Sequence, residues 1–412
     1  MKNIFRRISR KNNIPQKCSV DYINRETKIC LTALLSTYAA PDGYFYPCCI
    51  TSHSEDDRLL AMKGGSFIEA FNSEKIKGIR RQLAKGEWPS ACTSCQHSEA
   101  VGRKSHRQIF NSSSLSDHVE VVSRTAPDGQ VNYPIRALDV RWNNTCNFKC
   151  RMCSPSFSSA WEQDYKALGL TYAPPYDWSS AVETDEFISI LKTVTSIRFA
   201  GGEPLITDAH YEVVNKLIEL DTAQKITLNY TTNLSILKYK QYDLLEKWRH
   251  FKQVNLVFSL DGFGRVVEYS REGFNHERFI RNIAELKKNP EINLYSHCVS
   301  SIFSILSIPD YIRFCQRNHI DFGITCITHP PHYSSKILSN DIKAQIREVY
   351  DEKLSQRDFD YSFILNDMDR EIEDAEALRR SFKQLTESLD QIRGKKFCEC
   401  FPQFSGWFEE IE

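Results

Sequence analysis

Three features are missing from this sequence, and each absence removes a class of function. It has no uninterrupted apolar run long enough to cross a bilayer. It has no excess of either charge, because 53 basic residues balance 53 acidic ones, so a general affinity for nucleic acid or for an acidic membrane surface is not indicated. It also has no internal repeat. We therefore expect an ordinary globular protein that acts neither in a membrane nor on nucleic acid.

The N-terminus lacks the apolar stretch of a secretory signal. It is basic instead, with six positive residues before the first acidic one: Lys2, Arg6, Arg7, Arg10, Lys11 and Lys17. We interpret residues 1–29 as a basic, solvated leader. Without an export signal, the expected location is the cytoplasm.

Cysteine is abundant, with fourteen residues in 412. In a reducing cytosol, such cysteines are more often metal ligands or buried apolar residues than disulfides. Most of them stand in groups: Cys48–Cys49, Cys92–Cys95, Cys146–Cys150–Cys153 and Cys398–Cys400. The isolated Cys298 and Cys326 fall on strand candidates, and we interpret them as small buried hydrophobic residues. The role of Cys398 and Cys400 is left open.

The chain is longer than one hydrophobic core usually serves, which predicts a main domain with additions. Residues 111–134 read as a linker, because Ser112–Ser114 and then Pro127, Gly129 and Pro134 favour turns. Between residues 135 and 335, β-rich runs alternate with helical patterns. The six strand candidates are Ile135–Trp142, Ser196–Ala200, Ile226–Thr231, Val254–Leu260, Ile292–Val299 and Phe322–Ile327. Helical patterns lie near Glu183–Val194, Asp208–Leu220, Tyr239–His250, His276–Lys288 and Pro309–Asn318.

This alternation indicates βαβ units, a parallel sheet and an α/β fold. Six units fit a partial (β/α)6 barrel of the TIM type, and a doubly wound sheet has the same pattern. Residues 336–412 carry no strand pattern and predict a helical C-terminal extension with a short tail.

The sharpest motif is Cys146-Asn-Phe-Lys-Cys150-Arg-Met-Cys153, directly after the first strand candidate. Three thiolates this close together can each bind a different iron of one [4Fe-4S] cubane. A set of three leaves one iron open for another ligand, as a catalytic zinc site keeps one position free. The alternatives are a zinc site or a chance grouping of buried thiols.

The CxxxCxxC motif after a first strand resembles the signature of the radical S-adenosylmethionine (SAM) superfamily. Met152 stands where many members have an aromatic residue, which leaves the ligands themselves unchanged. Further segments that look like those of the family follow in the expected order at the ends of later strands. The resemblance implies SAM contacts at Gly201, Gly202, Glu203 and Pro204, at Thr232 and Asn233, at Ser259 and Asp261, and at Arg271.

The resemblance also implies a partial barrel over residues 135–335 and a mechanism. A [4Fe-4S] cluster, once reduced by one electron, cleaves SAM to methionine and a 5′-deoxyadenosyl radical. That radical takes a hydrogen atom from the substrate, while the protein supplies binding and orientation. The sequence does not identify a catalytic side chain.

The region at residues 30–110 resembles a twitch or SPASM-type auxiliary cluster domain, placed before the barrel instead of after it. The resemblance includes the hairpin from Asp42-Gly43 to Pro47-Cys48 and implies Cys30, Cys48, Cys92 and Cys95 as ligands of an auxiliary [4Fe-4S] cluster. Cys49 could replace Cys48, because neighbouring side chains on a strand point to opposite faces. A structural zinc site with four cysteines is the alternative.

Twitch-bearing relatives often modify peptides, so the resemblance implies a peptide or protein substrate. A small molecule, a sugar or a nucleoside is the alternative within the same chemistry. An electron donor such as flavodoxin or ferredoxin is implied as a partner. A hypothesis of another class is a non-catalytic zinc-binding interaction protein that uses both cysteine groups.

Overall fold

Residues 24, 26–100, 102, 104–355 and 359–411 are described by a computed structural model of the chain. The basic leader predicted at residues 1–29 lies outside the described residues as far as residue 23. Within the described part of the chain, no helix combines the length and the apolar character that crossing a membrane requires.

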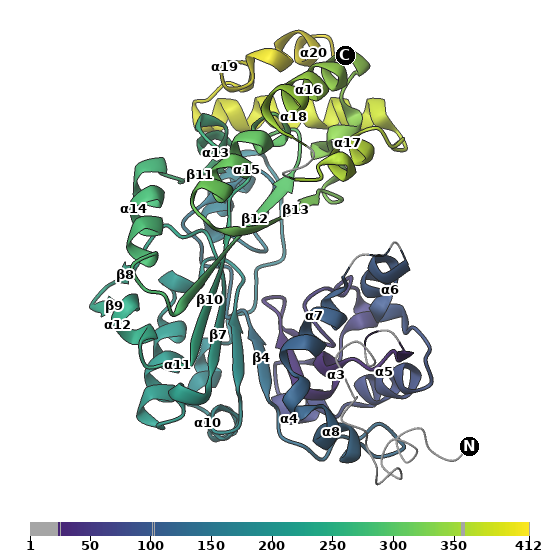
Figure 1. Cartoon of the computed structure of the whole chain (residues 1–412), viewed down its shortest axis with the longest axis vertical. Coiled ribbons are helices and arrows are strands. Elements are labelled where there is room, and N and C mark those ends of the chain that lie inside the picture. The colour runs from purple at the N-terminus through teal and green to yellow at the C-terminus, as the bar shows by residue number, and fades with distance from the viewer. Residues whose placement is uncertain (1–23, 25, 101, 103, 356–358, 412) are drawn as a thin grey trace.

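Six parallel strands form the centre of the molecule (Figure 1). They are β4 (Ala137–Val140), β6 (Ser196–Phe199), β7 (Thr227–Thr232), β10 (Gln253–Ser259), β12 (Ile292–Ser300) and β13 (Asp321–Cys326). Each of the six lies beside the one that precedes it, in the order β4-β6-β7-β10-β12-β13. A doubly wound sheet reverses its strand order at a switch point, whereas a (β/α) barrel does not. The strand order therefore decides for the partial (β/α)6 barrel, and the predicted α/β fold class is confirmed.

Helices that follow the strands pack on one face of this sheet. They are α10 (Asp185–Leu191), α11 (Asp208–Glu219), α12 (Leu244–Trp248), α14 (His276–Leu286) and α15 (Ile308–Arg317). The alternation of half-buried and buried residues along β7 and β10 reflects this covering. Phe258 of β10, for example, packs on Phe279 of α14 with 5.5 Å between ring centroids. The half-buried residues of these strands face the other way, toward the concave side.

One predicted helix is shorter than its pattern. The pattern over Tyr239–His250 yields only α12, which is preceded by a small antiparallel pair, β8 (Lys238–Tyr239) and β9 (Tyr242–Asp243). The Asp243 carboxylate accepts a hydrogen bond from the Leu245 amide at 3.0 Å and so caps the start of α12.

The N-terminal region extends the barrel sheet by three strands, β1 (Ser36–Ala39), β2 (Tyr44–Tyr46) and β3 (Leu60–Ala61). β1 runs parallel to β4, while β2 pairs antiparallel with β1 and β3 with β2. The hairpin predicted around Gly43 is present, and the φ of +85° at Gly43 is one that a glycine adopts without strain. The sheet thus has nine strands, and the N-terminal region shares it with the barrel.

Helices surround these three strands, as the purple and blue elements of Figure 1 show. They are α3 (Leu31–Leu35), α4 (Phe67–Phe71), α5 (Glu74–Ala84), α6 (Thr93–Ala100), α7 (His106–Ser113) and α8 (Leu115–Ser123). The segment interpreted as a linker, residues 111–134, therefore contains the end of α7 and all of α8. Val121 and Val122 of α8 are buried in the main core, which explains why this segment is helical despite its turn-forming residues.

The chain ends in the predicted helical extension, whose elements are α16 (Asn340–Lys353), α17 (Ser362–Met368), α18 (Ala375–Arg393), α19 (Phe397–Cys400) and α20 (Ser405–Glu409). It lies at the end of the barrel opposite α10 (Figure 1). Aromatic rings join it to the barrel: Phe303 lies 5.9 Å from Phe382 and 6.1 Å from Phe401, measured between ring centroids.

Candidate functional site

The three-cysteine loop, Cys146 to Cys153, follows β4 at its carboxyl end. Its middle forms the short strand β5 (Lys149–Cys150), which pairs antiparallel with β11 (Arg271–Glu272), so that Cys150 lies opposite Arg271. Burial raises the pKa of both Cys146 and Cys153 to about 12, and the nearby Cys150 thiol adds to the effect. The three thiols are therefore close enough to influence one another, and binding iron would require each to lose its proton.

The Gly-Gly-Glu-Pro segment packs directly on the cysteine loop. A side chain at Gly202, where φ is +42°, would bring its Cβ to 2.2 Å from the carbonyl oxygen of Thr145. The Glu203 amide donates to the same oxygen at 2.8 Å. Only glycine allows this approach, and Pro204 then begins a short 3-10 helix. The segment is thus fixed one residue away from the first cysteine.

Glu203 is fully buried and ties the second and third strands together. Its carboxylate accepts hydrogen bonds from the Thr232 hydroxyl at 2.7 Å, the Asn233 amide at 2.6 Å and the Leu205 amide at 3.1 Å. Burial raises the pKa of Glu203 to about 7, although these three hydrogen bonds each lower it. A carboxylate offers about four acceptor positions, so Glu203 retains capacity for one further donor.

Asp261 and Arg271 form a buried ion pair beside the cysteine loop. Arg271 Nε donates to Asp261 Oδ2 at 2.9 Å, and the other carboxylate oxygen accepts from the Val299 amide at 2.9 Å. Burial alone would lower the pKa of Arg271, but Asp261 and the thiol of Cys150 outweigh it and the pKa is raised. Arg271 therefore stays a cation next to Cys150.

The two remaining predicted contacts lie at the same edge. Asn233 donates from its side chain to the side-chain oxygen of Asn147, inside the cysteine loop, at 2.8 Å. Ser259 ends β10 in register with His297 of β12 and is half-buried. The residues expected to contact SAM thus lie at or beside the carboxyl ends of the barrel strands, where barrel enzymes build their sites.

The C-terminal extension holds the cysteine loop from the other side. The buried Arg151 forms an ion pair with Asp390 of α18, and the same carboxylate accepts from the Tyr269 hydroxyl at 2.8 Å. Arg393 donates to the carbonyl oxygen of Lys149 at 2.9 Å and pairs with Asp164 of α9 (Glu162–Ala167). Nothing in the local sequence marks Asp390 or Arg393, because their partners lie far away along the chain.

A second group of cysteines lines one cavity in the N-terminal region: Cys30, Cys48, Cys92 and Cys95. These are the four expected from the sequence. Burial raises the pKa of each thiol, and neighbouring cysteines add to this for Cys48, Cys92 and Cys95. Cys49 lies outside this cavity, with its Sγ 3.8 Å from His106 Nε2.

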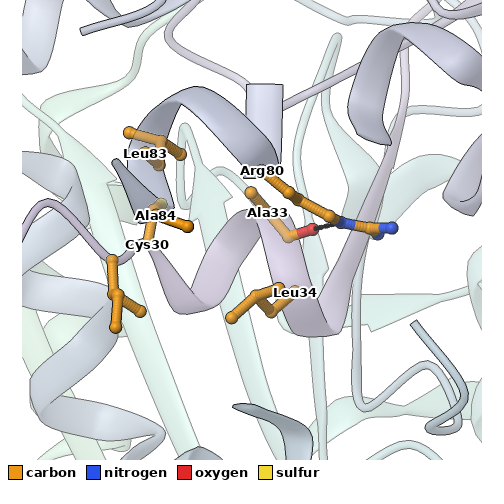
Figure 2. A pocket seen from close by; sticks show the side chains of 7 residues that line it. Cys30, Ala33, Leu34, Arg80, Leu83 and Ala84 are labelled. Atoms are coloured by element: carbon orange, nitrogen blue, oxygen red, sulfur yellow. Dashed lines mark hydrogen bonds between the residues drawn. The ribbon is translucent and has the colours of Figure 1, made fainter. Parts of the chain in front are cut away.

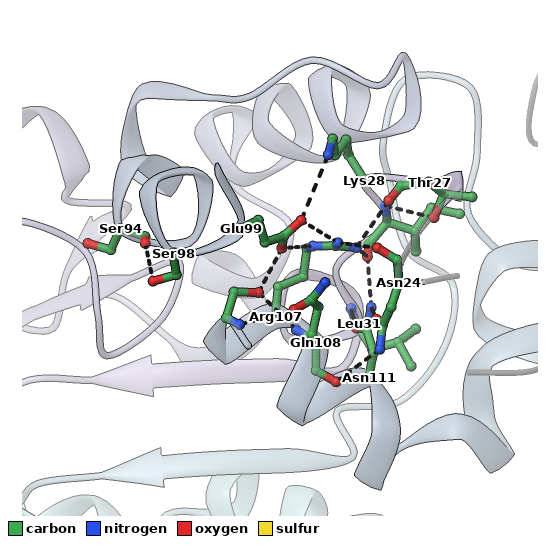
Figure 3. A network of polar contacts seen from close by, with 12 residues as sticks. Asn24, Thr27, Lys28, Leu31, Ser94, Ser98, Glu99, Arg107, Gln108 and Asn111 are labelled. Carbon is green, nitrogen blue, oxygen red and sulfur yellow. Dashed lines mark hydrogen bonds and ion pairs between the residues drawn. The ribbon is translucent and has the colours of Figure 1, made fainter. Parts of the chain in front are cut away.

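Arg107 lies at the wall of this cavity and is held by a dense network (Figure 3). Its guanidinium makes two hydrogen bonds of 2.9 Å to the Glu99 carboxylate and one of 3.0 Å to the Ile29 carbonyl oxygen. The side chain is 1% exposed. Sequence reasoning missed Arg107, which brings a positive charge close to thiols that must become negative if they bind metal.

A smaller apolar pocket lies beside Cys30 (Figure 2). Arg80 borders it, but its guanidinium already donates hydrogen bonds to main-chain carbonyl oxygens. Its Nε, for example, donates to the Ala33 carbonyl oxygen at 2.7 Å. The other lining residues around Cys30, such as Leu34 and Leu83, are apolar. This pocket offers no group for catalysis.

No group of three or more His, Cys, Asp or Glu side chains in the described part of the chain is arranged to hold a metal ion. In a [4Fe-4S] cubane each cysteine binds a different iron, so its ligands stand farther apart than those of one ion. Both cysteine groups remain candidates for a cluster, because a cubane does not require its ligands to converge on one ion.

Part of the chain matches a known protein family. Residues 140–299 match the model described as Radical SAM superfamily. The radical SAM cyclopropyl synthase TigE of Paramaledivibacter caminithermalis is 23% identical over 224 residues, which are 53% of this chain and 46% of that protein. A GTP 3′,8-cyclase of Campylobacter lari is 29% identical over 132 residues, 30% of this chain and 34% of that protein. The chain spans less than half the length of these curated relatives.

Among solved structures, Streptococcus suis SuiB bound to S-adenosylmethionine is 17% identical, with 64% of this chain and 56% of that chain covered and a TM-score of 0.38.

Proposed function

We propose that this chain is an enzyme of the radical SAM superfamily, whose model matches residues 140–299, and that Cys146, Cys150 and Cys153 hold its catalytic [4Fe-4S] cluster. One observation carries the proposal: the three thiols are neighbours at the sheet edge where Glu203 and the Asp261–Arg271 pair also lie. Three cysteines leave one iron of a cubane open to SAM. With both bound, the cluster supplies the one-electron cleavage of SAM to methionine and a 5′-deoxyadenosyl radical, which takes a hydrogen atom from the substrate.

The carboxyl ends of three successive barrel strands, β6, β7 and β10, are assigned to SAM together with Arg271 of β11. The residues are Gly201, Gly202, Glu203, Pro204, Thr232, Asn233, Ser259, Asp261 and Arg271. Glu203 uses its remaining acceptor position for the ammonium group of SAM. Arg271 engages Asp261 through Nε, so its two terminal nitrogens are directed to the carboxylate of SAM as a charge-assisted pair.

Cys30, Cys48, Cys92 and Cys95 are assigned to an auxiliary [4Fe-4S] cluster. Four thiolates around one cavity carry a large negative charge, and the buried Arg107 at the cavity wall offsets part of it. A zinc ion is the competing occupant, and metal analysis separates the two, since zinc is colourless and iron–sulfur clusters absorb visible light.

The proposed substrate is a peptide or protein, as in many proteins with a twitch-type cysteine arrangement. One structural feature supports an extended peptide: β13 is the last strand of the sheet, and no strand among the described residues pairs with its outer edge. An extended chain can add to such an edge through main-chain hydrogen bonds. Asp321 and Thr325 of β13 are exposed there.

A nucleotide substrate is the second candidate. The sequence similarity between part of this chain and a GTP 3′,8-cyclase favours it, because the name of that enzyme states a nucleotide as substrate. Either substrate requires an electron donor, for which a flavodoxin or a ferredoxin is proposed, and the reducing cytoplasm is the proposed location because it keeps unligated thiols reduced.

The test is 5′-deoxyadenosine formation by anaerobically reconstituted protein supplied with SAM and dithionite. Wild type is expected to form the product and to hold about eight iron atoms per chain, about four for each cluster. Cys150→Ala is expected to form none and to keep about four iron atoms. Cys315→Ala is the matched control, because Cys315 is fully buried in α15 and belongs to neither cysteine group.

Loss of product in Cys150→Ala together with full activity in Cys315→Ala supports the assignment. Zinc at the three-cysteine loop, or equal product from Cys150→Ala and wild type, contradicts it. Cys48→Ala tests the auxiliary site in the same way, and it should remove about four iron atoms while Cys49→Ala removes none.

A further inference from the structure

One row of polar side chains crosses the concave face of the sheet. Its members are paired in register from strand to strand: Tyr38, Asp139, Arg198, Asn229, Asn255 and Asn293. Side chains in register on neighbouring strands lie on the same face. The interior of a (β/α) barrel is normally filled by layers of branched apolar side chains. A polar row here indicates a surface that contacts a polar ligand instead of a packed core.

The asparagine half of the row satisfies itself. Asn293 donates to Asn255, and Asn255 to Asn229, each over 2.9 Å between the side-chain nitrogen and oxygen. Asn229 donates in turn to the Ser196 hydroxyl at 3.0 Å. This half is uncharged and internally bonded.

The other half of the row is charged and not balanced. Arg141 directly follows β4, two positions after Asp139, and its Nε lies 3.5 Å from Asp139 Oδ1. Arg198, opposite Asp139, donates to the Thr231 hydroxyl at 3.2 Å and has no carboxylate within 4.0 Å among the described residues. Asp139 therefore balances Arg141 but not Arg198, which is half-buried. The positive charge of Arg198 has no close counter-charge unless a partner binds.

One buried polar atom at the same place has no partner. The Tyr38 hydroxyl makes no hydrogen bond among the described residues, and the buried atoms Asp139 Oδ1 and Arg141 Nε meet only in their own ion pair at 3.5 Å. Tyr38 is 1% exposed, and the Arg141 guanidinium lies 4.8 Å from the centre of its ring. Buried polar groups are nearly always paired, so an unpartnered hydroxyl beside a long ion pair points to a missing ligand.

We propose that Arg141 and Arg198, with the Tyr38 hydroxyl, bind a carboxylate group of the substrate inside the barrel. This inference rests on the proposed function, because it names a chemical feature of that enzyme's substrate. One carboxylate neutralises the one excess positive charge, and a guanidinium fork matches its two oxygens. In a peptide the group is an acidic side chain or the C-terminus.

The position of this site agrees with a role toward substrate. Cys49 and His106, which lie 3.8 Å apart, come from the N-terminal region and stand beside Asp139 and Arg198. His106 also lines the cavity of the four auxiliary cysteines. The carboxylate site therefore lies where the barrel interior meets the auxiliary cavity. The competing role for the two arginines is to offset the charge of an auxiliary cluster without touching substrate.

The test is calorimetric titration of the reconstituted protein with SAM present. The probes are N-acetyl-L-glutamate, its neutral counterpart N-acetyl-L-glutamine, and inorganic phosphate. Wild type should bind the glutamate derivative at least about tenfold more tightly than either other probe. Arg198→Gln should lose that preference. Asp139→Asn should strengthen glutamate binding, because it raises the excess positive charge, whereas simple damage to the fold would weaken it.

Arg281→Gln, at an exposed arginine of α14, is the control and should bind like wild type. Equal binding of the glutamate and glutamine derivatives, tighter binding of phosphate, or an unchanged preference in Arg198→Gln overturns the proposal. So does a shifted cluster reduction potential in Arg198→Gln without any change in probe binding. The titration does not depend on SAM cleavage. If the protein forms 5′-deoxyadenosine but does not bind N-acetyl-L-glutamate, only this inference is contradicted. If it binds N-acetyl-L-glutamate but forms no 5′-deoxyadenosine, only the proposed function is contradicted.

Discussion

Burial sets the protonation state of single side chains throughout this molecule, and His210 is the clearest case away from the cysteines. It is fully buried in α11, and its Nε2 lies 2.8 Å from the Tyr230 hydroxyl. Burial lowers the pKa of His210 from 6.5 to about 3. The folded protein therefore holds a neutral imidazole where the unfolded chain would bind a proton below pH 6.5.

A group whose pKa is lowered by folding stabilises the protein above its unfolded pKa and loses that contribution as the pH falls toward the folded value. Between pH 7 and pH 5, His210 should reduce the free energy of unfolding by about 2 kcal/mol. His210→Gln should abolish this part of the pH dependence in urea unfolding at the two pH values. His250→Gln, at an exposed position, should leave it unchanged. An unaltered pH dependence in His210→Gln would refute the assignment.

Asp390 is one of two residues, with Arg393, through which the C-terminal extension contacts the cysteine loop. Asp390→Asn leaves the guanidinium of Arg151, which is 1% exposed, without its counter-charge. Breaking a buried pair in this way costs about 3–5 kcal/mol. We expect a matching loss in denaturant unfolding and faster removal of iron by a chelator. Asp369→Asn breaks the exposed pair with Arg347 and should cost less than about 1 kcal/mol.

Residues in compact motifs could be predicted from the sequence, and residues joined across the chain could not. The three-cysteine loop and Glu203 stand out because their spacing carries the chemistry. Their roles as ligands stay predictions. Asp390 could not be found, since its partner Arg151 lies far away in the sequence. A signal did exist for Arg141 and Asp139: charged residues two apart in a strand candidate must share one face.

At the scale of elements, the pairing of β1 with β4 decides how the N-terminal region relates to the barrel. Because the two strands are hydrogen-bonded in one sheet, they should open together. In hydrogen exchange followed by mass spectrometry, Ser36–Ala39 should exchange as slowly as Ala137–Val140. Markedly faster exchange of the first segment would mean that the N-terminal region unfolds independently.

The elements themselves were largely predictable. All six barrel strands lie within two residues or so of their expected bounds, because β-branched and aromatic runs bounded by turn residues are a local signal. The linker was harder to predict. The serine run predicts a turn, and a turn is present, because Ser114 separates α7 from α8. This turn is a single residue instead of the long loop that was expected.

At the scale of the whole molecule, the barrel, the N-terminal region and the C-terminal extension share one continuous core. Alternation of strands and helices was visible in the sequence, but the strand order was not, because pairing joins residues that are distant along the chain. The order separates a barrel from a doubly wound sheet, and it became known only from the structure.

Because the core is shared, we expect that the chain cannot fold stably without its C-terminal extension. A chain ending at residue 338 would expose Phe303 and Tyr269, whose rings pack on Phe401 at 6.1 and 5.4 Å between centroids. It would also leave Arg151 unpaired. We expect this chain to aggregate in size-exclusion chromatography and to keep no cluster absorbance after reconstitution. A monomeric truncated chain with a stable cluster would contradict this expectation.

The parallel pairing of β1 with β4 also has a consequence for biosynthesis. The ribosome delivers β1 and all four cysteines of the auxiliary cavity well before it delivers β4, so β1 emerges with one edge unpaired. An unpaired edge invites association with other chains. The N-terminal region reaches its final form only after Val140 has left the ribosome, a few residues ahead of Cys146. Translation itself therefore brings the completion of one cysteine group and the appearance of the other close together in time.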